Sequence, residues 1–152
     1  MNQITIKKTN LFDSKKFFTI RNNPQNRKNS LNSSKIKIKD HNEWFNKNYK
    51  NKYYFTCYRG KSKIGYVRGD LLGDTIAISI ALDNKNQNKN IGTECLKLFE
   101  KKINHNCILV AKIKKKILFL YVFLKKMVSV NFIVKKIFQL TIKLKTIQQI
   151  SI

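Results

Sequence analysis

The sequence has little of what metal, disulfide and membrane proteins require. It has two histidines in 152 residues, too few for a metal site built on imidazoles. Its three cysteines (Cys57, Cys95 and Cys107) form no CxxC pair, which favours reduced core thiols over disulfides or zinc. No apolar run approaches the roughly eighteen residues that cross a bilayer, and the first residues lack the apolar segment of a signal peptide. We therefore expect a cytoplasmic protein without a metal or a membrane span.

Acidic residues are also scarce, since 8 of them face 32 lysines and arginines and give a net charge of +24. Such a charge ordinarily suggests nucleic acid. Half of the excess, however, follows residue 100, where there are twelve lysines and no acid. No recognised nucleic-acid motif and no basic stripe interleaved with aromatic residues is present, so binding of polyanions would rest on charge alone and fall steeply with salt. The length indicates one domain with a real core.

The most informative segment runs from 75 to 99. Isoleucine and leucine alternate with small or polar residues over 75–83, which predicts a half-buried strand. An asparagine-rich turn follows, and apolar residues then recur at helical spacing from Ile91 to Phe99. A strand that opens through a turn onto a helix directs free N–H groups and the positive end of the helix dipole at one point. The segment therefore predicts a phosphate cradle.

The residues of this turn distinguish between the families that build such cradles. It has neither the Gly-Lys-Ser/Thr of a Walker loop nor a G-x-G-x-x-G. The string from Gln87 to Gly92, Gln-Asn-Lys-Asn-Ile-Gly, resembles the acetyl-CoA loop of the GNAT N-acetyltransferases, Arg/Gln-x-x-Gly-x-Gly/Ala. Asn90 stands where that family usually has glycine, and asparagine is the next most tolerant residue of positive φ. The alternative is a plain strand-to-helix connection in which Gly92 serves packing.

The order of elements upstream extends the resemblance over residues 3–113. We expect a strand at 4–8 and a pair of helices, the first over Asp13 to Ile20 with Asp13 or Ser14 as its cap and the second around His41 to Phe45. A hairpin at 53–68 follows, and a strand at 107–113 pairs in parallel with 75–83. This order implies an α/β (α+β) fold with a mixed, mostly antiparallel sheet flanked by helices. A finer string is similar to the acetyltransferases that act on nucleotide-activated amino sugars in bacterial nonulosonic acid pathways, and less closely to the ribosomal-protein alanine acetyltransferases. Its residues are Arg21, Asn22, Arg27, Ser30, Asn32, Ile36, His41, Trp44, Phe45, Ile64, Gly65, Val67, Arg68 and Asp70.

The resemblance implies acetyl-CoA as co-substrate and direct attack of a primary amine on the thioester in a ternary complex. The cofactor-binding residues would be Ile80, Ala81, Leu82, Gln87, Asn88, Lys89, Asn90, Ile91, Gly92 and Thr93. The substrate-binding residues would be Arg21, Asn22, His41, Trp44 and Arg68. Trp44 could instead be ordinary helix core, and the two arginines could be surface cations. His41, Glu43 and Asp70 are candidate bases, each of which a structural or sugar-binding role also explains; no acid is assigned.

The last third of the chain departs from the family pattern. No acid, glycine or proline follows Glu100, and the family's next helix, Asn-x-x-Ser/Ala-x-x-x-Phe/Tyr-x-Lys-x-Gly-Phe, is missing. Lys114, Lys115 and Lys116 imply a run of adenines, and a shifted frame beyond them can spell Asn-Thr-Phe-Ser-Leu-Arg-Val-Phe-Lys-Lys-Asn-Gly-Phe. We therefore expect an incomplete GNAT-like domain at 1–116, and a frameshifted, basic and apolar tail at 117–152 in which the C-terminal helix and strands are replaced or missing.

Such a chain would have weak or absent activity and poor solubility. Two other classes stay open. One is a non-catalytic acyl-CoA-binding or interaction module, and the other is a basic binder of nucleic acid or membrane surfaces. The tail could also be genuine and lie on a membrane surface.

Overall fold

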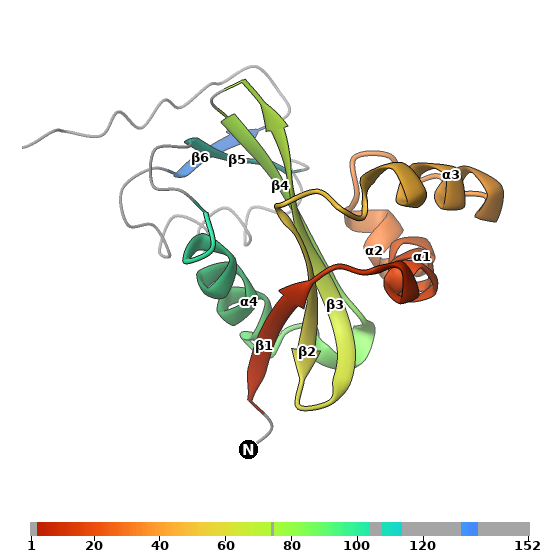
Figure 1. Ribbon diagram of the computed structural model, residues 1–152, viewed down its shortest axis with the longest axis horizontal. Coiled ribbons are helices and arrows are strands. Elements are labelled where there is room, and N and C mark those ends of the chain that lie inside the picture. The colour runs from red at the N-terminus through yellow and green to blue at the C-terminus, as the bar shows by residue number, and fades with distance from the viewer. Residues whose placement is uncertain (1–2, 74, 104–107, 114–131, 137–152) are drawn as a thin grey trace, which may run out of the picture.

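The computed structural model describes residues 3–73, 75–103, 108–113 and 132–136. These residues form one sheet of six strands in the order β1-β2-β3-β4-β5-β6 (Figure 1). The strands are β1 Ile4–Lys8, β2 Tyr54–Arg59, β3 Ser62–Leu72, β4 Thr75–Leu82, β5 Ile108–Ile113 and β6 Phe132–Lys136. β1 to β4 pair antiparallel, whereas β5 pairs in parallel with β4 and β6 in parallel with β5. The predicted mostly antiparallel sheet, and its parallel pair, are confirmed.

Helices cover both faces of this sheet. They are α1 Ser14–Asn22, α2 Pro24–Asn29, α3 Ile38–Asn48 and α4 Ile91–Glu100, with short 3-10 turns η1 Leu11–Asp13 and η2 Asn84–Asn86. In Figure 1, α4 lies on one side of the strands and α1, α2 and α3 lie on the other. The helices predicted around Asp13 to Ile20 and around His41 to Phe45 are therefore present, and each is longer than the pattern indicated.

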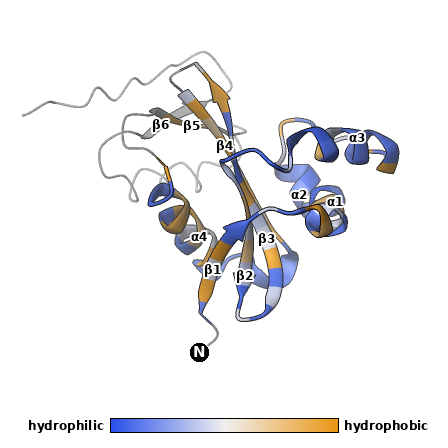
Figure 2. Ribbon diagram, in the orientation of Figure 1, coloured by the Kyte–Doolittle hydropathy of each residue, from blue (hydrophilic) through white to orange (hydrophobic). Residues whose placement is uncertain are grey.

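Two apolar clusters hold these layers together. The larger one joins α4 to the strands and includes Phe55, Ile76 and Phe99. The smaller one lies under α1 and α3, where the ring of Phe17 stacks on Tyr66 at 4.3 Å between centroids. Burying one such ring contributes about 2 kcal/mol. Figure 2 shows apolar bands along the strands, while α2 and α3 are mostly hydrophilic, so α3 packs only through a narrow face.

Asp13 connects the start of α1 to the sheet. Its Oδ2 accepts from the Asn10 amide at 2.9 Å and from the Thr56 hydroxyl at 2.8 Å. Lys63 Nζ lies 2.6 Å from its Oδ1. The prediction of Asp13 as a cap holds for its position, but its side chain makes no capping bond to α1. It is instead a fully buried carboxylate that links α1 to β2 and β3.

Candidate functional site

The loop between β4 and α4 turns sharply before the helix begins. Asn88 and Asn90 both have φ of +58°, a conformation that costs most residues free energy but that asparagine tolerates. The expectation that Asn90 replaces glycine at a left-handed position is thereby confirmed. The 3-10 turn at 84–86 was not predicted, because its three residues show no apolar period.

The amides at the start of α4 lie at the mouth of this loop. The first intrahelical bond runs from the Glu94 amide to the Asn90 carbonyl at 3.2 Å, so the N–H groups of Ile91, Gly92 and Thr93 precede it and have no carbonyl within the helix. The Asn90 side chain does not cap them. The Thr93 hydroxyl is buried there without a hydrogen-bond partner among the described residues. This end of the helix can therefore donate several hydrogen bonds to an anion.

Gly92 is not explained by packing. A Cβ added to it would lie 3.9 Å from Leu82 Cδ1 and 4.0 Å from Ile80 Cδ1, which are ordinary contacts. By contrast, a Cβ at Gly65 would come within 2.5 Å of the Ala81 carbonyl oxygen. Packing demands glycine at position 65 and not at position 92, which weighs against the packing interpretation of the loop.

β4 has an open edge next to the loop. Its pairing with β5 runs from Thr75 with Ile108 to Ile78 with Ala111 and then stops within the described residues. The Asp83 amide donates to the Ile64 carbonyl of β3 at 2.9 Å. Because backbone groups alternate in direction along a strand, those of Ile80 and Leu82 point away from β3. They point toward the edge of β4 where the pairing with β5 has ended. An extended ligand could pair there.

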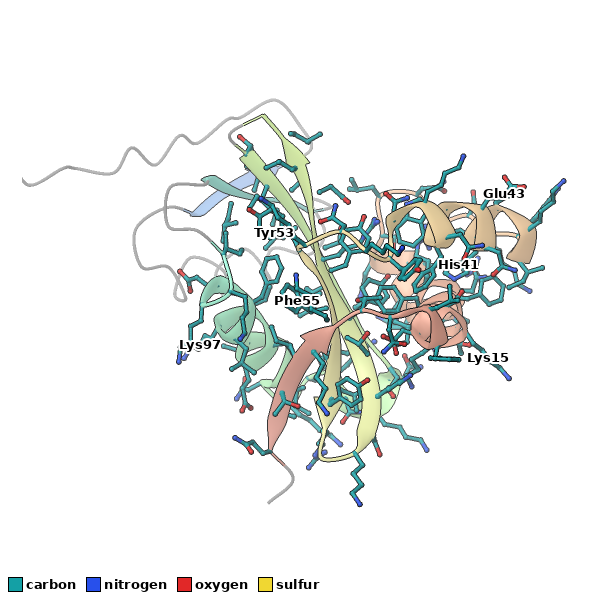
Figure 3. All side chains as sticks on the ribbon, in the orientation of Figure 1. Lys15, His41, Glu43, Tyr53, Phe55 and Lys97 are labelled. Atoms are coloured by element: carbon teal, nitrogen blue, oxygen red, sulfur yellow. The ribbon has the colours of Figure 1, made fainter. Side chains whose placement is uncertain are left out.

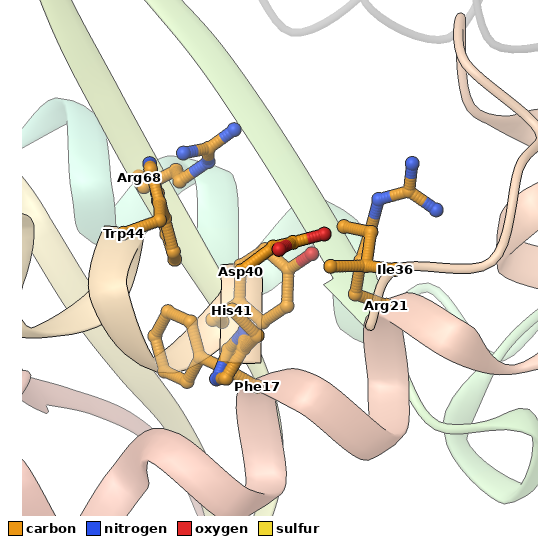
Figure 4. A pocket seen from close by; sticks show the side chains of 8 residues that line it. Phe17, Arg21, Ile36, Asp40, His41, Trp44 and Arg68 are labelled. Atoms are coloured by element: carbon orange, nitrogen blue, oxygen red, sulfur yellow. The ribbon is translucent and has the colours of Figure 1, made fainter. Parts of the chain in front are cut away.

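A pocket of about 260 Å³ lies between α1, α3 and the face of β3 that these helices cover (Figure 4). Its lining residues are Phe17, Arg21, Ile36, Asp40, His41, Trp44, Tyr66 and Arg68. Four of the five predicted substrate-binding residues are thus brought together from three elements. The fifth, Asn22, does not line the pocket; its side chain binds the backbone of Ile36 through bonds of 2.9 and 2.8 Å and so fixes that wall.

The two arginines of the pocket differ in their partners. Arg68 Nη1 donates to Tyr54 Oη at 3.3 Å and lies 3.8 Å from Asp70 Oδ2. Arg21 Nη2 donates to the Asn32 carbonyl at 2.7 Å, and its Nη1 is buried without a hydrogen-bond partner among the described residues. Arg21 therefore lines the pocket and keeps one buried guanidinium nitrogen that no described residue compensates, and neither arginine is a simple surface cation.

The three candidate bases occupy different environments. His41 is buried, its Nε2 lies 3.0 Å from the Ser14 carbonyl oxygen and 3.1 Å from Ser14 Oγ, and burial lowers its pKa. Glu43 is on the exposed face of α3, outside the pocket (Figure 3). Asp70 accepts from the Tyr54 hydroxyl; burial and then this bond raise the pKa of Tyr54 to about 12.

Sequence reasoning missed Asp40, which lines the pocket beside His41. In Figure 4 its carboxylate lies between the two arginine side chains. Its place within the string that carries the resemblance was the only sequence signal. In the part of the chain that the structure describes, no group of histidine, cysteine and acidic residues could hold a metal ion, and no helix is long and apolar enough to cross a membrane.

The pocket and the open edge of β4 are one strand apart. Tyr66 of the pocket pairs with Ala81, and Arg68 pairs with Ser79. Paired residues of neighbouring strands project on the same face, and such strands are about 4.8 Å apart. A ligand in the pocket could therefore reach a second ligand that extends along the edge of β4.

Comparison with known proteins supports the fold. No protein-family model matches the sequence, and no curated protein matches it significantly. Among solved structures, it is similar to a ribosomal-protein-alanine N-acetyltransferase from Brucella melitensis (TM-score 0.66, 15% identity, 80% of this chain and 82% of that one). It is also similar to a Salmonella typhimurium protein solved with its cofactor acetyl-CoA (0.64, 16%, 95% and 88%) and to an N-acetyltransferase from Staphylococcus aureus Mu50 (0.65, 18%, 82% and 81%). The chain has the fold of the GNAT acetyltransferases.

Proposed function

We propose that this protein is an N-acetyltransferase that moves an acetyl group from acetyl-CoA to a primary amine. The observation that carries the proposal is the edge of β4 beyond Ile78, which no other described strand pairs with. This edge lies near the uncapped amides of α4 and one strand from the pocket. A diphosphate and an extended arm would fit the loop and the edge, and an amine would fit the pocket. Acetyl-CoA combines a diphosphate with an amide-bearing arm and supplies the activated acetyl group.

Backbone amides of residues 88–93 would hold the diphosphate, and Lys89 and the Thr93 hydroxyl would assist. The edge at Ile80, Ala81 and Leu82 would pair with the amides of the arm like an added strand. A backbone N–H near Leu82 would donate to the thioester oxygen as charge develops on it. None of these groups has to move a proton, so their contribution is binding and electrostatic stabilisation.

The acceptor amine would be held in the pocket, and most of the rate would come from bringing the two reactants together. The amine must first lose a proton, since an ammonium group has no lone pair. The candidates are His41, Glu43 and Asp70, to which the structure adds Asp40. Because the Nε2 of His41 is held at Ser14 and Glu43 lies outside the pocket, we favour Asp40, which lines the pocket, or Asp70, which pairs with Arg68, acting through water.

We further propose a nucleotide-linked amino sugar as the acceptor. The support is the buried Nη1 of Arg21, which has no hydrogen-bond partner in the described part of the chain, and the guanidinium of Arg68, since both suit phosphate oxygens. The Trp44 ring adds a surface for stacking. The similarity to an alanine acetyltransferase favours a different amine, a protein N-terminus. Turnover with peptide amines but not with amino-sugar nucleotides would decide for that second candidate.

We propose that residues 1–116 form the catalytic domain and that the segment from about 117 onward is read out of frame. The composition after Glu100 supports this. Because β6 lies within this segment, the segment still contains a strand. The proposal therefore concerns the reading frame and the missing family helix. The bases between the codons of Ala111 and Lys136 decide it, because codons unable to spell that helix would refute it. We expect weak turnover from the present chain, and higher turnover from a version with the tail in the alternative frame.

Gly92→Asp tests the cofactor site with opposite expected effects on folding and binding. A carboxylate in the first turn of α4 favours the helix dipole by about 0.5 kcal/mol, so the melting temperature should hold or rise. The same charge should repel the diphosphate and weaken acetyl-CoA binding, measured by calorimetry, by at least about tenfold. Asn46→Asp, on the exposed face of α3, adds an equal charge elsewhere and should bind normally. Unchanged acetyl-CoA binding in Gly92→Asp would refute the site. If the unaltered chain and its version with the alternative tail both bind acetyl-CoA but release no thiol, the protein is a non-catalytic module.

A further inference from the structure

The side chain of Asn26 in α2 connects three segments of the chain. Its Nδ2 donates to the carbonyl of Ile20 in α1 at 2.8 Å and to that of Leu82, the last residue of β4, at 2.9 Å. Its Oδ1 accepts from Gln87 Nε2 at 2.9 Å. Both amide protons and the oxygen are engaged in a buried position, so the side chain has one favourable orientation.

The Leu82 carbonyl receives two of these bonds. Besides Asn26, Gln87 Nε2 donates to it at 2.8 Å, which occupies both of its lone pairs. This carbonyl belongs to the open edge of β4. A ligand that pairs with the edge can use both backbone groups of Ile80 and the N–H of Leu82, but it finds the Leu82 carbonyl occupied. The pairing edge therefore has a fixed end.

We propose that Asn26 is a positioning residue for the pantetheine arm of acetyl-CoA, an inference that rests on the proposed function. Together with Gln87, it closes the β4 edge at Leu82 and so fixes the register in which an added strand can pair. The same side chain holds the carbonyl of Ile20, the residue that precedes Arg21 of the pocket. Asn26 thereby fixes the position of α1, which carries Arg21, relative to the open edge of β4.

A second link joins the same two regions. Lys16 of α1 pairs with Asp83, the residue after β4, at 3.1 Å. Both partners are about a quarter exposed, and such pairs contribute little free energy. Among the described residues, the Asn26 bonds are thus the main polar connection, because they are buried and therefore stronger than bonds in contact with solvent.

Asn23 provides a matched control for effects on folding alone. It begins α2 and accepts from the Gln25 amide at 3.0 Å, and no bond joins its side chain to β4. Asn23→Ala should lower the melting temperature through loss of a helix cap. It should leave the end of the β4 edge unchanged, whereas Asn26→Ala should affect both.

The test measures the affinity of the full chain for CoA and for ADP, which has the diphosphate but not the pantetheine arm. Asn26→Ala and Gln87→Ala should each weaken CoA by about tenfold and ADP by less than about threefold. The double variant should be no weaker than the stronger single one, because both side chains act on one carbonyl. Asn23→Ala should change neither affinity.

Equal losses for CoA and ADP, or an Asn26→Ala variant that binds like Asn23→Ala, would overturn the proposal. If Asn26→Ala does not fold, Gln87→Ala decides alone, and its unchanged CoA affinity would overturn it. Failure of the unaltered chain to bind CoA would instead refute the proposed function. Hydrogen exchange would then decide the positioning role, which requires faster exchange at the 80–82 amides in Gln87→Ala than in Asn23→Ala.

Discussion

The guanidinium carbon of Arg68 lies 4.8 Å from the centre of the Trp44 ring. This contact joins β3 to α3 at the wall of the pocket, and the bond from Arg68 to the Tyr54 hydroxyl also holds the guanidinium. A cation placed over an aromatic face in this way is oriented before any ligand arrives. The Nη1 of Arg21 has no such partner among the residues that the structure describes, so we expect mutation of Arg21 to affect ligand binding more than stability.

Arg21→Gln should weaken binding of a nucleoside diphosphate such as UDP by about tenfold, because a charge-assisted bond to a partly buried phosphate contributes about 1.5 kcal/mol. Stability should change little, since only the bond to the Asn32 carbonyl is lost. Lys35→Gln removes an equal charge from an exposed position beside the pocket and should weaken UDP less than about twofold. Calorimetry at fixed salt measures both, and equal losses would show that only net charge matters.

Lys63→Met should destabilise the fold without involving the site. Asp13 is fully buried, and Lys63 is the cation beside it at 2.6 Å. Removing one partner leaves a buried carboxylate uncompensated; since Lys63 is one-third exposed, we expect a loss of about 2 kcal/mol rather than the larger value of a fully buried pair. Urea denaturation at neutral pH measures the loss. Lys61→Met, in the exposed turn before β3, should be nearly neutral, and similar midpoints for the two variants would contradict the expectation.

The environment of His41 should make stability depend on pH. Burial lowers the pKa of His41 below 6.5 and outweighs the hydrogen bond to the Ser14 carbonyl. As the pH falls below 6.5, the unfolded chain takes up a proton on this histidine that the folded chain does not, so the free energy of unfolding falls. The loss ends below the lowered pKa of the folded state. In melts between about pH 7.5 and 5, His41→Asn should show a shallower slope than the unaltered chain, and identical slopes would refute the assignment.

The sequence predicted those parts of the fold that depend on local periodicity. The alternation at 75–83, the helical spacing from Ile91 and the positive φ of Asn90 all have local causes, and the structure confirms them. Asn26 gave no such signal, because it bonds to Leu82 across 56 residues. A single polar residue in a polar helix looks the same whether or not its amide closes a strand edge. The convergence of residues on the pocket came from the family resemblance alone.

The tail contains a strand that the sequence analysis did not predict. Phe132, Ile133 and Val134 are good strand formers, and they belong to β6, which pairs with β5 from Leu109 to Ile113. Because 117–152 was interpreted as a frameshifted tail, no strand was predicted from these residues. A segment read out of frame still has β propensity, because apolar and β-branched residues favour a strand whatever their origin. The presence of β6 is therefore compatible with either origin of the tail.

Asn90 allows a test of the loop that separates backbone strain from ligand contact. Its φ of +58° costs a residue with an ordinary Cβ about 1 kcal/mol, whereas glycine adopts it freely. Asn90→Ala should therefore lower the free energy of unfolding by about 1 kcal/mol, and Asn90→Gly should stay within about 0.5 kcal/mol of the unaltered chain, since glycine's gain is offset by its freedom in the unfolded state. Urea midpoints measure both. If the two variants are equally stable, the left-handed turn at residue 90 does not exist in solution, and the amides of α4 are not presented as described.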